Sequence, residues 1–144
     1  MPTVRHQRER YFEENGFGTS AYDAPVFRVR VGPISLPFPN PGLLPFHDLH
    51  HVLTGYGTGL VGEAEISAFE LRTGCRSPIV ILLCIGSVAI GLLLAPRRVL
   101  RAWSRTRHAV SLYGSSAALD ELLDLELTDL RRKLRIPDGG LGQK

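Results

Sequence analysis

The stretch FHDLHHVLTGYGTGLVGEAE, residues 46–65, contains three histidines, one aspartate and two glutamates within twenty positions. A helix is predicted over residues 45–54, because a proline suits the first helical turn and Gly55 disfavours continuation. A second helix is predicted over residues 63–72. The stretch therefore predicts two helices joined by a glycine-broken loop, directly upstream of the most apolar part of the chain.

His47 and His51 have the spacing of two ligands to one ion. They are four residues apart, so on a helix they share a face, with Cβ atoms about 6 Å apart. Glu63 begins the second predicted helix and can fold back toward the imidazoles, which would complete a two-histidine, one-carboxylate set typical of catalytic zinc or non-haem iron. The alternatives are a surface or satisfied core histidine pair and a glutamate that only complements the helix dipole.

The neighbouring polar residues receive weaker assignments. Asp48 points about 100° away from His47 on a helix, so it is expected to orient an imidazole or to act only as a first-turn acid. His50 falls off the shared face and is expected to be exposed. Glu65 is expected to be a helix-start acid, and Glu70 is expected to face solvent rather than act as a second carboxylate.

Before this stretch, the sequence predicts a helix over residues 4–14 that stops at Asn15-Gly16. An alternating pattern from residue 26 predicts a hairpin around Gly32-Pro33. A later set of prolines is expected to end the hairpin, because a proline offers no backbone donor to a strand ladder: Pro37, Pro39 and Pro41.

After this stretch, a helix is predicted over 99–112, and another behind Ser115-Ser116 that carries a stripe of Leu119, Leu122 and Leu123. A last short helix is predicted from Thr128 to just before Pro137. The fold class is mainly α, a single helical domain over residues 1–144 with a small N-terminal β-hairpin. Its parts are expected to be a helix, hairpin and loop (1–45), a helical metal-site region (46–136) and a frayed tail (137–144).

Twenty residues without a charge lie between Arg76 and Arg97, and as a helix they would be about 30 Å long, enough to cross a bilayer. A span would put the histidines and the following arginines on opposite sides of the membrane. We therefore expect a core or lipid-embracing helix, with a single transmembrane span as the alternative. The small residues of this apolar run suit either a groove for a prenyl chain or ordinary helix packing. The residues predicted to bind lipid are Ile79, Leu83, Ile90, Gly91 and Leu94.

An acid-free arginine block follows the apolar run and predicts attachment to an anionic membrane surface, at roughly 1 kcal/mol per basic residue. It comprises Arg97, Arg98, Arg101, Arg105 and Arg107. The net charge of only +3 gives little reason to expect nucleic acid as a partner. Two cysteines without metal-ligand spacing favour a reducing compartment, and no signal-peptide pattern is visible. The predicted location is cytoplasmic, peripheral to the inner membrane.

The motif also carries a family resemblance. H-D-x-x-H at residues 47–51, eleven further residues and Glu63, with VLTGYGT between, resemble the signature of the coenzyme Q biosynthesis protein family known as number four. PRRVLRAWSRTRHAVSLYG and LLDLELTDLRRKLRIP resemble its later helices more loosely, so the resemblance covers about residues 46–136. The chain resembles a short bacterial-type member. It has less helix before the motif than is usual, and His50 stands where an aromatic residue is common.

The resemblance implies a helical fold and a divalent metal, zinc or iron with magnesium as a third option, at His47, Asp48, His51 and Glu63. It also implies peripheral membrane attachment, binding of a polyprenylated ubiquinone precursor, contact with other ubiquinone biosynthesis enzymes, and decarboxylase or hydroxylase (lyase) chemistry at ring carbon one. We also expect homo-oligomers. The alternatives are a non-catalytic scaffold that binds prenyl lipid and holds a structural metal, and a small single-span membrane protein.

Overall fold

The computed structural model describes residues 1–142. These residues form seven α-helices, two short 3-10 helices and one antiparallel hairpin, so the predicted mainly α fold with an N-terminal hairpin is confirmed. The α-helices are α1 (Val4–Asn15), α2 (Leu44–Thr54), α3 (Leu60–Thr73), α4 (Pro78–Leu94), α5 (Pro96–Arg105), α6 (Leu119–Leu123) and α7 (Leu127–Lys133). The strands are β1 (Val26–Val31) and β2 (Ile34–Pro39), and the 3-10 helices are η1 (Thr19–Ala21) and η2 (Leu112–Gly114).

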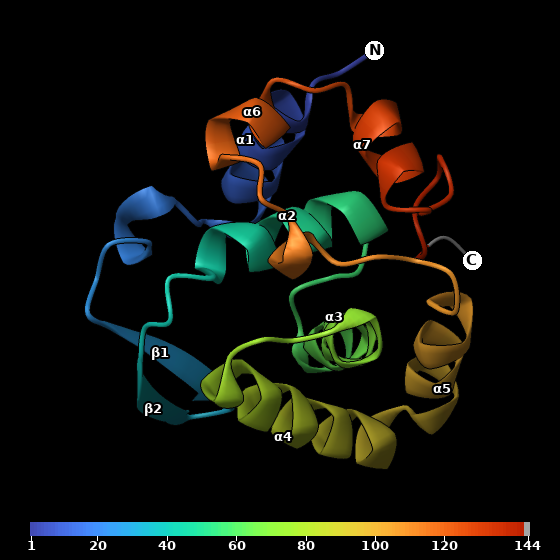
Figure 1. Ribbon diagram of the computed structural model, residues 1–144. Coiled ribbons are helices and arrows are strands. Elements are labelled where there is room, and N and C mark those ends of the chain that lie inside the picture. The colour runs from blue at the N-terminus through green and yellow to red at the C-terminus, as the bar shows by residue number, and fades with distance from the viewer. Residues whose placement is uncertain (143–144) are drawn as a thin grey trace.

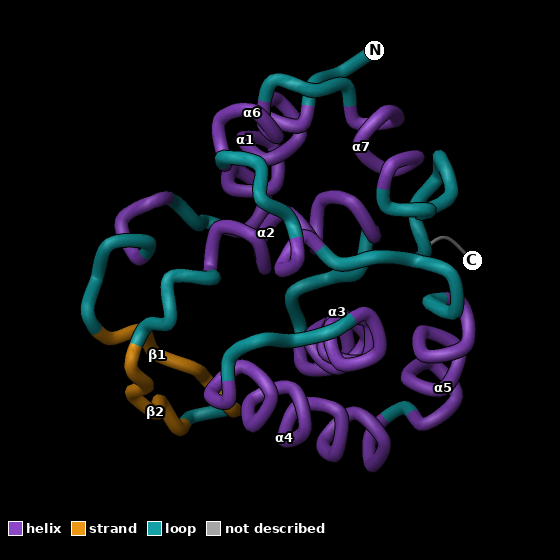
Figure 2. Tube along the Cα trace, in the orientation of Figure 1, coloured by secondary structure: helices purple, strands orange, loops and turns teal. Residues whose placement is uncertain are grey.

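Helix α2 crosses the middle of the molecule. Helices α1, α6 and α7 lie on one side of it, and α3, α4 and α5 lie on the other (Figure 1). The hairpin stands apart at the edge of this helical body, as the tube trace shows (Figure 2). Leu49 and Leu53 of α2 and Ile66 and Phe69 of α3 are completely buried. The core is thus built around the two helices that the histidine-rich stretch predicts.

The local signals at the ends of the first two helices agree with the structure. The Thr3 hydroxyl accepts a hydrogen bond from the His6 backbone and caps α1, which ends at Gly16 with a left-handed φ of 67°. Gly55, with a φ of 77°, ends α2 where predicted. Helix α3 begins at Leu60, earlier than predicted.

The predicted helix over 99–112 is wrong at both ends, because the helical segment is α5. It begins at Pro96 and ends at Arg105. The next residue, Thr106, donates its hydroxyl to the Ala102 carbonyl at 2.6 Å, and the Val110 backbone then donates to Leu134 instead of continuing the helix. The segment turns toward α7 because its backbone groups find partners there.

The prediction that the prolines end the hairpin holds for Pro39, the last residue of β2, but is wrong for Pro37, which lies inside the strand. The Asn40 backbone donates to the Pro25 carbonyl at 3.0 Å, which assigns the even-numbered residues of this strand to the hydrogen-bonded positions. Pro37 and Pro39 occupy the alternate positions, where a ladder needs no donor. The ladder therefore tolerates both prolines.

The predicted frayed tail is wrong for the residues that the structure describes. Leu141 is only 4% exposed and belongs to the hydrophobic core. The backbone groups of Leu141 and Gly142 donate to the Thr54 carbonyl at 2.7 and 2.9 Å, so this segment satisfies the end of α2. The last two residues of the predicted tail, 143–144, lie outside the described residues.

The apolar run forms α4, and no helix within residues 1–142 is both long and apolar enough to cross a membrane. Helix α4 ends at Leu94, and a new helix starts at Pro96. Its inner face packs on α3 through Cys84 and Gly91, which are buried. Its outer face lies at the edge of the molecule (Figure 1) and exposes large apolar side chains: Leu82, Ile85, Leu92, Leu93 and Leu94.

Candidate metal centre

Three side chains of α2 and α3 bring their ligand atoms together. His47 Nε2 lies 3.3 Å from His51 Nε2. The Glu63 carboxylate lies 3.4 Å from His47 Nε2 and 3.3 Å from His51 Nε2. One ligand atom of each residue lies within 4.8 Å of the other two. The three residues that the sequence predicts as ligands are therefore neighbours in the fold.

The backbone that positions Glu63 depends on a close approach at Gly62. A Cβ atom at Gly62 would lie only 2.1 Å from the Gly57 carbonyl oxygen, so no other residue fits there without a shift of the backbone. This contact folds the loop that follows α2 against the first turn of α3. As a result, Glu63 in that first turn faces the histidines of α2.

The hydrogen-bond partners of the two imidazoles fix which nitrogen of each ring faces the group. His47 Nδ1 donates to Glu70 Oε1 at 2.9 Å, and His51 Nδ1 donates to the Tyr56 carbonyl oxygen at 3.0 Å. Both partners can only accept, so in a neutral ring the proton sits on Nδ1. Both Nε2 atoms then present lone pairs toward each other and toward the Glu63 carboxylate.

These three groups present lone pairs to one another, so a cation between them would relieve their repulsion. The distances between their ligand atoms suit a divalent metal. A tetrahedral ion with bonds of about 2.0–2.1 Å would separate its ligand atoms by about 3.3 Å. The separations of 3.3 and 3.4 Å match this value. Imidazole and carboxylate donors suit zinc and iron. The residues present therefore fit the metal that the sequence predicts.

In the metal-free protein a proton takes the place of the cation. Burial opposes the charged form of His47, but Glu70 and Glu63 outweigh it and raise the pKa of His47 well above its usual value. Burial would raise the pKa of Glu63, but the adjacent His47 and His51 imidazoles hold it at about 2. A metal that binds here would therefore displace a proton from His47.

Glu70 contradicts the prediction that it faces solvent, because it is 0% exposed. Its Oε1 accepts from the Tyr113 hydroxyl at 2.7 Å and from His50 Nδ1 at 2.7 Å, in addition to His47. Burial disfavours its charge, but His47 and His50 lower the pKa of Glu70 well below its usual value. Glu70 is thus an ionised acceptor that holds the His47 ring.

His50 also contradicts its prediction, because it is 0% exposed instead of facing solvent. Its Nδ1 donates to Glu70, and its Nε2 accepts the Leu112 backbone donor at 2.9 Å. Burial lowers the pKa of His50, although Glu70 opposes this shift. His50 is therefore a neutral link between α2 and η2. The prediction failed because α2 is covered on both sides, which its own sequence pattern does not reveal.

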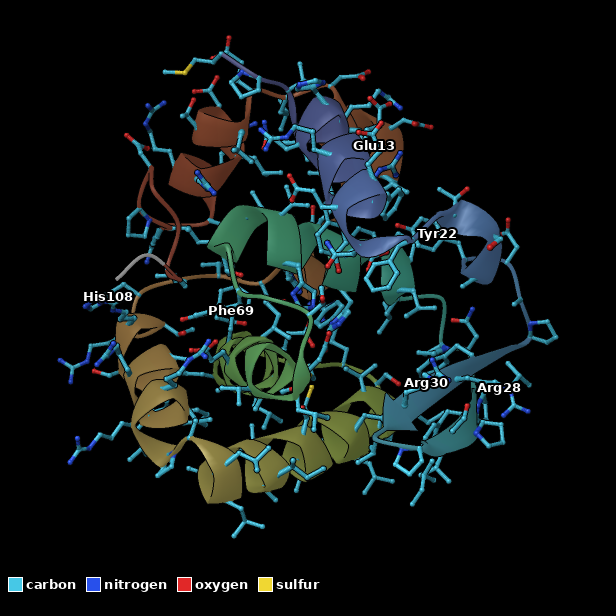
Figure 3. All side chains as sticks on the ribbon, turned by 180° about the vertical axis from the view of Figure 1, so that it is seen from behind. Glu13, Tyr22, Arg28, Arg30, Phe69 and His108 are labelled. Carbon is cyan, nitrogen blue, oxygen red and sulfur yellow. The ribbon has the colours of Figure 1, made fainter. Side chains whose placement is uncertain are left out.

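Asp48 lies beside the metal group but is not one of the three clustered residues. Its Oδ2 accepts from the Tyr22 hydroxyl at 2.7 Å, and Figure 3 shows Tyr22 beside α2. The Asn40 amide donates to the carbonyls of Ala21, Tyr22 and Ala24, so it holds the loop that carries Tyr22. Burial raises the pKa of Asp48, although Tyr22 and the histidines oppose this.

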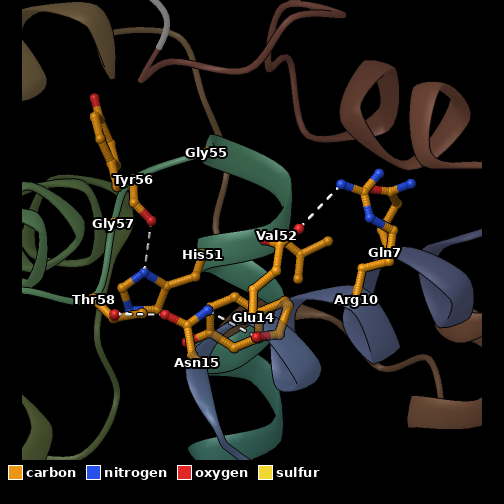
Figure 4. Close-up of a pocket in the computed structure, with 11 residues that line it drawn as sticks. Gln7, Arg10, Glu14, Asn15, His51, Val52, Gly55, Tyr56, Gly57 and Thr58 are labelled. Carbon is orange, nitrogen blue, oxygen red and sulfur yellow. Dashed lines mark hydrogen bonds and ion pairs between the residues drawn. The ribbon is translucent and has the colours of Figure 1, made fainter.

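The sequence pattern gave no signal for the residues that α1 brings to the centre. Tyr11 stacks on His51 with ring centroids 5.7 Å apart. Together with Asn15 and Thr58, which share a hydrogen bond of 2.8 Å, it borders a cavity of about 340 Å³ next to His51 (Figure 4). An N-terminal tyrosine can be assigned to this site only once the packing of α1 on α2 is known.

The remaining predicted positions lie on α3, α4 and α5. Glu65 was expected to be a helix-start acid, but it is buried and accepts two hydrogen bonds from Arg98. Gly91, predicted to border a lipid groove, packs on α3, since a Cβ there would lie 2.2 Å from Ala64 Cβ. Ile79, Leu83 and Ile90 are half-buried and Leu94 is exposed, and the arginines of the predicted block are exposed: Arg97, Arg98, Arg101, Arg105 and Arg107.

The two cysteines lie closer to the centre than their spacing in the sequence indicates. Cys84 Sγ donates to Glu70 Oε2 at 3.5 Å. Ligand atoms of Glu70, Cys75 and Cys84 all lie within 4.8 Å of one another. Glu70 therefore contacts His47 through one carboxylate oxygen and the cysteine pair through the other.

Comparison of the chain with models of known protein families finds no match, and comparison with curated protein sequences finds none either. The family resemblance of residues 46–136 therefore stays a prediction. The metal-site geometry and the charge distribution described above do not depend on it.

Proposed function

We propose that the protein binds one divalent metal ion at His47, His51 and Glu63 and acts on, or presents, a polyprenylated ring precursor of ubiquinone at a membrane surface. The metal assignment rests on the convergence of two Nε2 lone pairs and a carboxylate, whose atoms lie 3.3 to 3.4 Å apart. The H-D-x-x-H motif and its spacing to Glu63 support the ubiquinone precursor.

The exposure of the site favours a catalytic metal over a structural one. A structural zinc site is closed by four protein ligands, whereas a catalytic site keeps a position open. The Glu63 side chain is 36% exposed and the His47 side chain 25%, so the group is accessible from one side. Three protein ligands with one accessible side leave room for a substrate oxygen.

The chain's own residues would prepare this site. A bound divalent ion would polarise a substrate oxygen or activate water, and iron would add redox chemistry. Glu70 and the Tyr56 carbonyl hold the two imidazoles in orientation. Asp48, paired with the Tyr22 hydroxyl, adds a half-buried carboxyl group next to the histidines, and its raised pKa suits it to hold or release a proton.

Membrane attachment is supported by the outer surface of α4 and α5. Leu82 and Leu93 of α4 are 64% and 86% exposed, and Leu100 and Trp103 of α5 are also exposed. Arg97 and the other arginines of α5 lie on the adjoining segment. Apolar side chains, an exposed tryptophan and basic residues are the combination that binds peripheral proteins to anionic bilayers.

The metal assignment is tested by measuring the metal content of protein purified without added metal. We expect about one equivalent in the wild type and a loss of stoichiometric metal in His47→Ala, His51→Ala and Glu63→Ala. His108→Ala is the matched control, because His108 is exposed and lies far from the site at the edge of the molecule (Figure 3). Equal metal content in all five proteins would reject the ligand set.

The substrate assignment is tested with the metal-loaded protein and a polyprenylated hydroxybenzoate under oxygen. Release of carbon dioxide that is lost in Glu63→Ala supports decarboxylation at the ring. Retention of the prenylated compound without any turnover would favour the scaffold that only presents it. If the metal-loaded protein neither binds nor converts the compound, the proposed substrate is wrong.

A further inference from the structure

The two cysteines of the chain meet across the turn that joins α3 to α4. Cys75 follows the end of α3, Cys84 lies on α4, and both are free thiols. Although nine positions separate them in the sequence, their sulfur atoms lie within 4.8 Å of each other. A change of rotamer moves a cysteine sulfur by about 3 Å. A local adjustment is therefore enough to bring the sulfurs to the bonding distance of about 2.05 Å.

The turn itself allows such an adjustment. Gly74, directly before Cys75, has a φ of 110°, and no atom lies within 4 Å of the position that a Cβ would take. A glycine in open surroundings leaves the backbone free to change its dihedral angles. Cys75 can therefore move toward α4, while Cys84 stays fixed where α4 packs on α3.

The two thiols differ in access and in acidity. Cys75 is half-buried whereas Cys84 is only 3% exposed, so a dissolved oxidant reaches Cys75 first. A hydrogen bond with Cys84 lowers the pKa of Cys75, although burial opposes this shift. The same hydrogen bond, together with burial, raises the pKa of Cys84. Because the thiolate is the reactive form, Cys75 is the nucleophile of the pair and Cys84 is the thiol that reacts second.

Glu70 is the third member of this cluster, but both of its oxygens already accept hydrogen bonds. Oε1 accepts from His47, His50 and Tyr113, and Oε2 accepts from Cys84. Two thiols without a free third ligand make a poor metal site, since even an open zinc site has three protein ligands. The cluster therefore favours a bond between the two sulfurs over a second metal ion.

We propose that Cys75 and Cys84 are a redox-sensing pair, which hydrogen peroxide converts to a reversible disulfide. The Cys75 thiolate attacks one oxygen of the peroxide, the O–O bond breaks, and the departing hydroxide takes a proton from solvent to form water. The Cys84 sulfur then attacks the sulfenic acid on Cys75, the S–O bond breaks, and the Cys84 proton leaves with the hydroxide as a second water. Two thiols are thus oxidised and one peroxide is reduced. A dithiol reductant reverses the bond by exchange.

The pair lies next to the proposed metal centre but does not depend on it. Disulfides in reducing compartments, such as the one predicted from the sequence, are usually transient and redox-sensing. The bond would take the Cys84 hydrogen away from Glu70 Oε2, so oxidation would reach the carboxylate that holds His47. None of the three proposed metal ligands takes part in the chemistry. Failure of the metal assignment would therefore leave this proposal standing.

Peptide mapping of the peroxide-treated full chain tests the pair. Trypsin cuts after Arg72, Arg76 and Arg97, so the two cysteines fall on separate peptides, 73–76 and 77–97. We expect a monomer whose intact mass falls by two hydrogens and whose two peptides are linked, and dithiothreitol should reverse both changes. Linked dimers, or separate oxidation of both sulfurs without a link, would overturn the proposal.

Substitutions distinguish the first thiol from the second. Cys84→Ser should leave a sulfenic acid on Cys75 that dimedone labels, whereas Cys75→Ser should react with peroxide at least roughly tenfold more slowly, because its remaining thiol is buried. The matched control is Cys84→Ser with Gly86→Cys. It keeps two thiols but moves the second to the opposite face of α4, where nothing lies within 4 Å of a Cβ. Equal yields of linked peptide from the control and the wild type, or dimedone labelling of Cys75→Ser instead of Cys84→Ser, would overturn the assignment.

Thermal unfolding shows whether the folded protein accommodates the bond. A disulfide across a short loop restricts the unfolded chain, so the oxidised wild type should melt above the reduced protein. The melting temperature of Cys75→Ser should not rise with peroxide. An oxidised wild type that melts below the reduced one would overturn the proposal, because the bond would then form only by distorting the fold.

Discussion

At Glu70, a single carboxylate connects the proposed metal centre to the rest of the interior. One oxygen accepts from His47, His50 and Tyr113, and the other accepts from Cys84. An ionised carboxylate behind a ligand histidine fixes the ring and increases the basicity of its outer nitrogen. A neutral side chain of the same shape would keep the packing but lose both effects.

Glu70→Gln should therefore lower zinc affinity by about 10 to 100-fold without removing any ligand. Competition with a chromophoric chelator measures this change. Glu65→Gln is the control, because Glu65 is a buried carboxylate of the same helix that pairs with Arg98 instead of a histidine. The assigned role of Glu70 would be wrong if Glu70→Gln bound zinc as tightly as the wild type, or if both variants lost the same affinity.

The sequence predicts the ligand residues better than their supports, for a physical reason. The shared face of His47 and His51 follows from helical periodicity, which is a local property. The burial of Glu70 depends on Tyr113, 43 residues away, and the setting of Asp48 depends on Tyr22, 26 residues away. Such partners are brought together by packing that no single periodic pattern encodes. Similarly, nothing in the C-terminal glycines indicates that Leu141 enters the core.

Among the elements, α4 presents two glycines in opposite environments. At Gly91 a Cβ would lie 2.2 Å from Ala64 Cβ and 2.9 Å from Val99 Cγ2, so the helix can pack on α3 and α5 only without a side chain there. At Gly86 nothing lies within 4 Å of the corresponding position. The small residues of this helix therefore do not form one uniform surface.

The same substitution at these two glycines should have opposite effects on stability. Gly91→Ala should lower the free energy of unfolding by about 1–3 kcal/mol, because the added methyl group overpacks the helix interface. Gly86→Ala should raise it by about 0.4–1 kcal/mol, because alanine restricts the unfolded chain at an exposed helical position. Urea denaturation measures both values. A stability of Gly91→Ala equal to that of Gly86→Ala would contradict the close packing.

On the scale of the whole molecule, the apolar exposure is unevenly distributed. Helices α1, α6 and α7 cover one side of α2 (Figure 1). At the opposite edge of the molecule, no described helix or strand covers the outer face of α4. Exposed apolar patches rimmed by charge mark interaction surfaces in soluble proteins. Because arginines follow α4, an anionic bilayer is the partner that we propose for this face.

Leu93→Gln should weaken flotation with anionic vesicles roughly tenfold, because a leucine side chain contributes about 1.5–3 kcal/mol when it is removed from water. Phe17→Gln is the control, since Phe17 is an exposed apolar residue after α1. Raised salt should weaken binding of all three proteins, because it screens the arginines. If Phe17→Gln bound the vesicles more weakly than Leu93→Gln, the proposed membrane contact would lie on the α1 side instead.

Tyr56 joins the proposed metal centre to the hydrophobic core, since its carbonyl oxygen accepts from His51 while the residue itself is only 6% exposed. Metal occupancy and folding are then thermodynamically linked. A metal that binds only the folded chain raises the free energy of unfolding, and a chain that unfolds releases its metal. The shift of the melting temperature with the concentration of free zinc therefore measures the affinity of the centre.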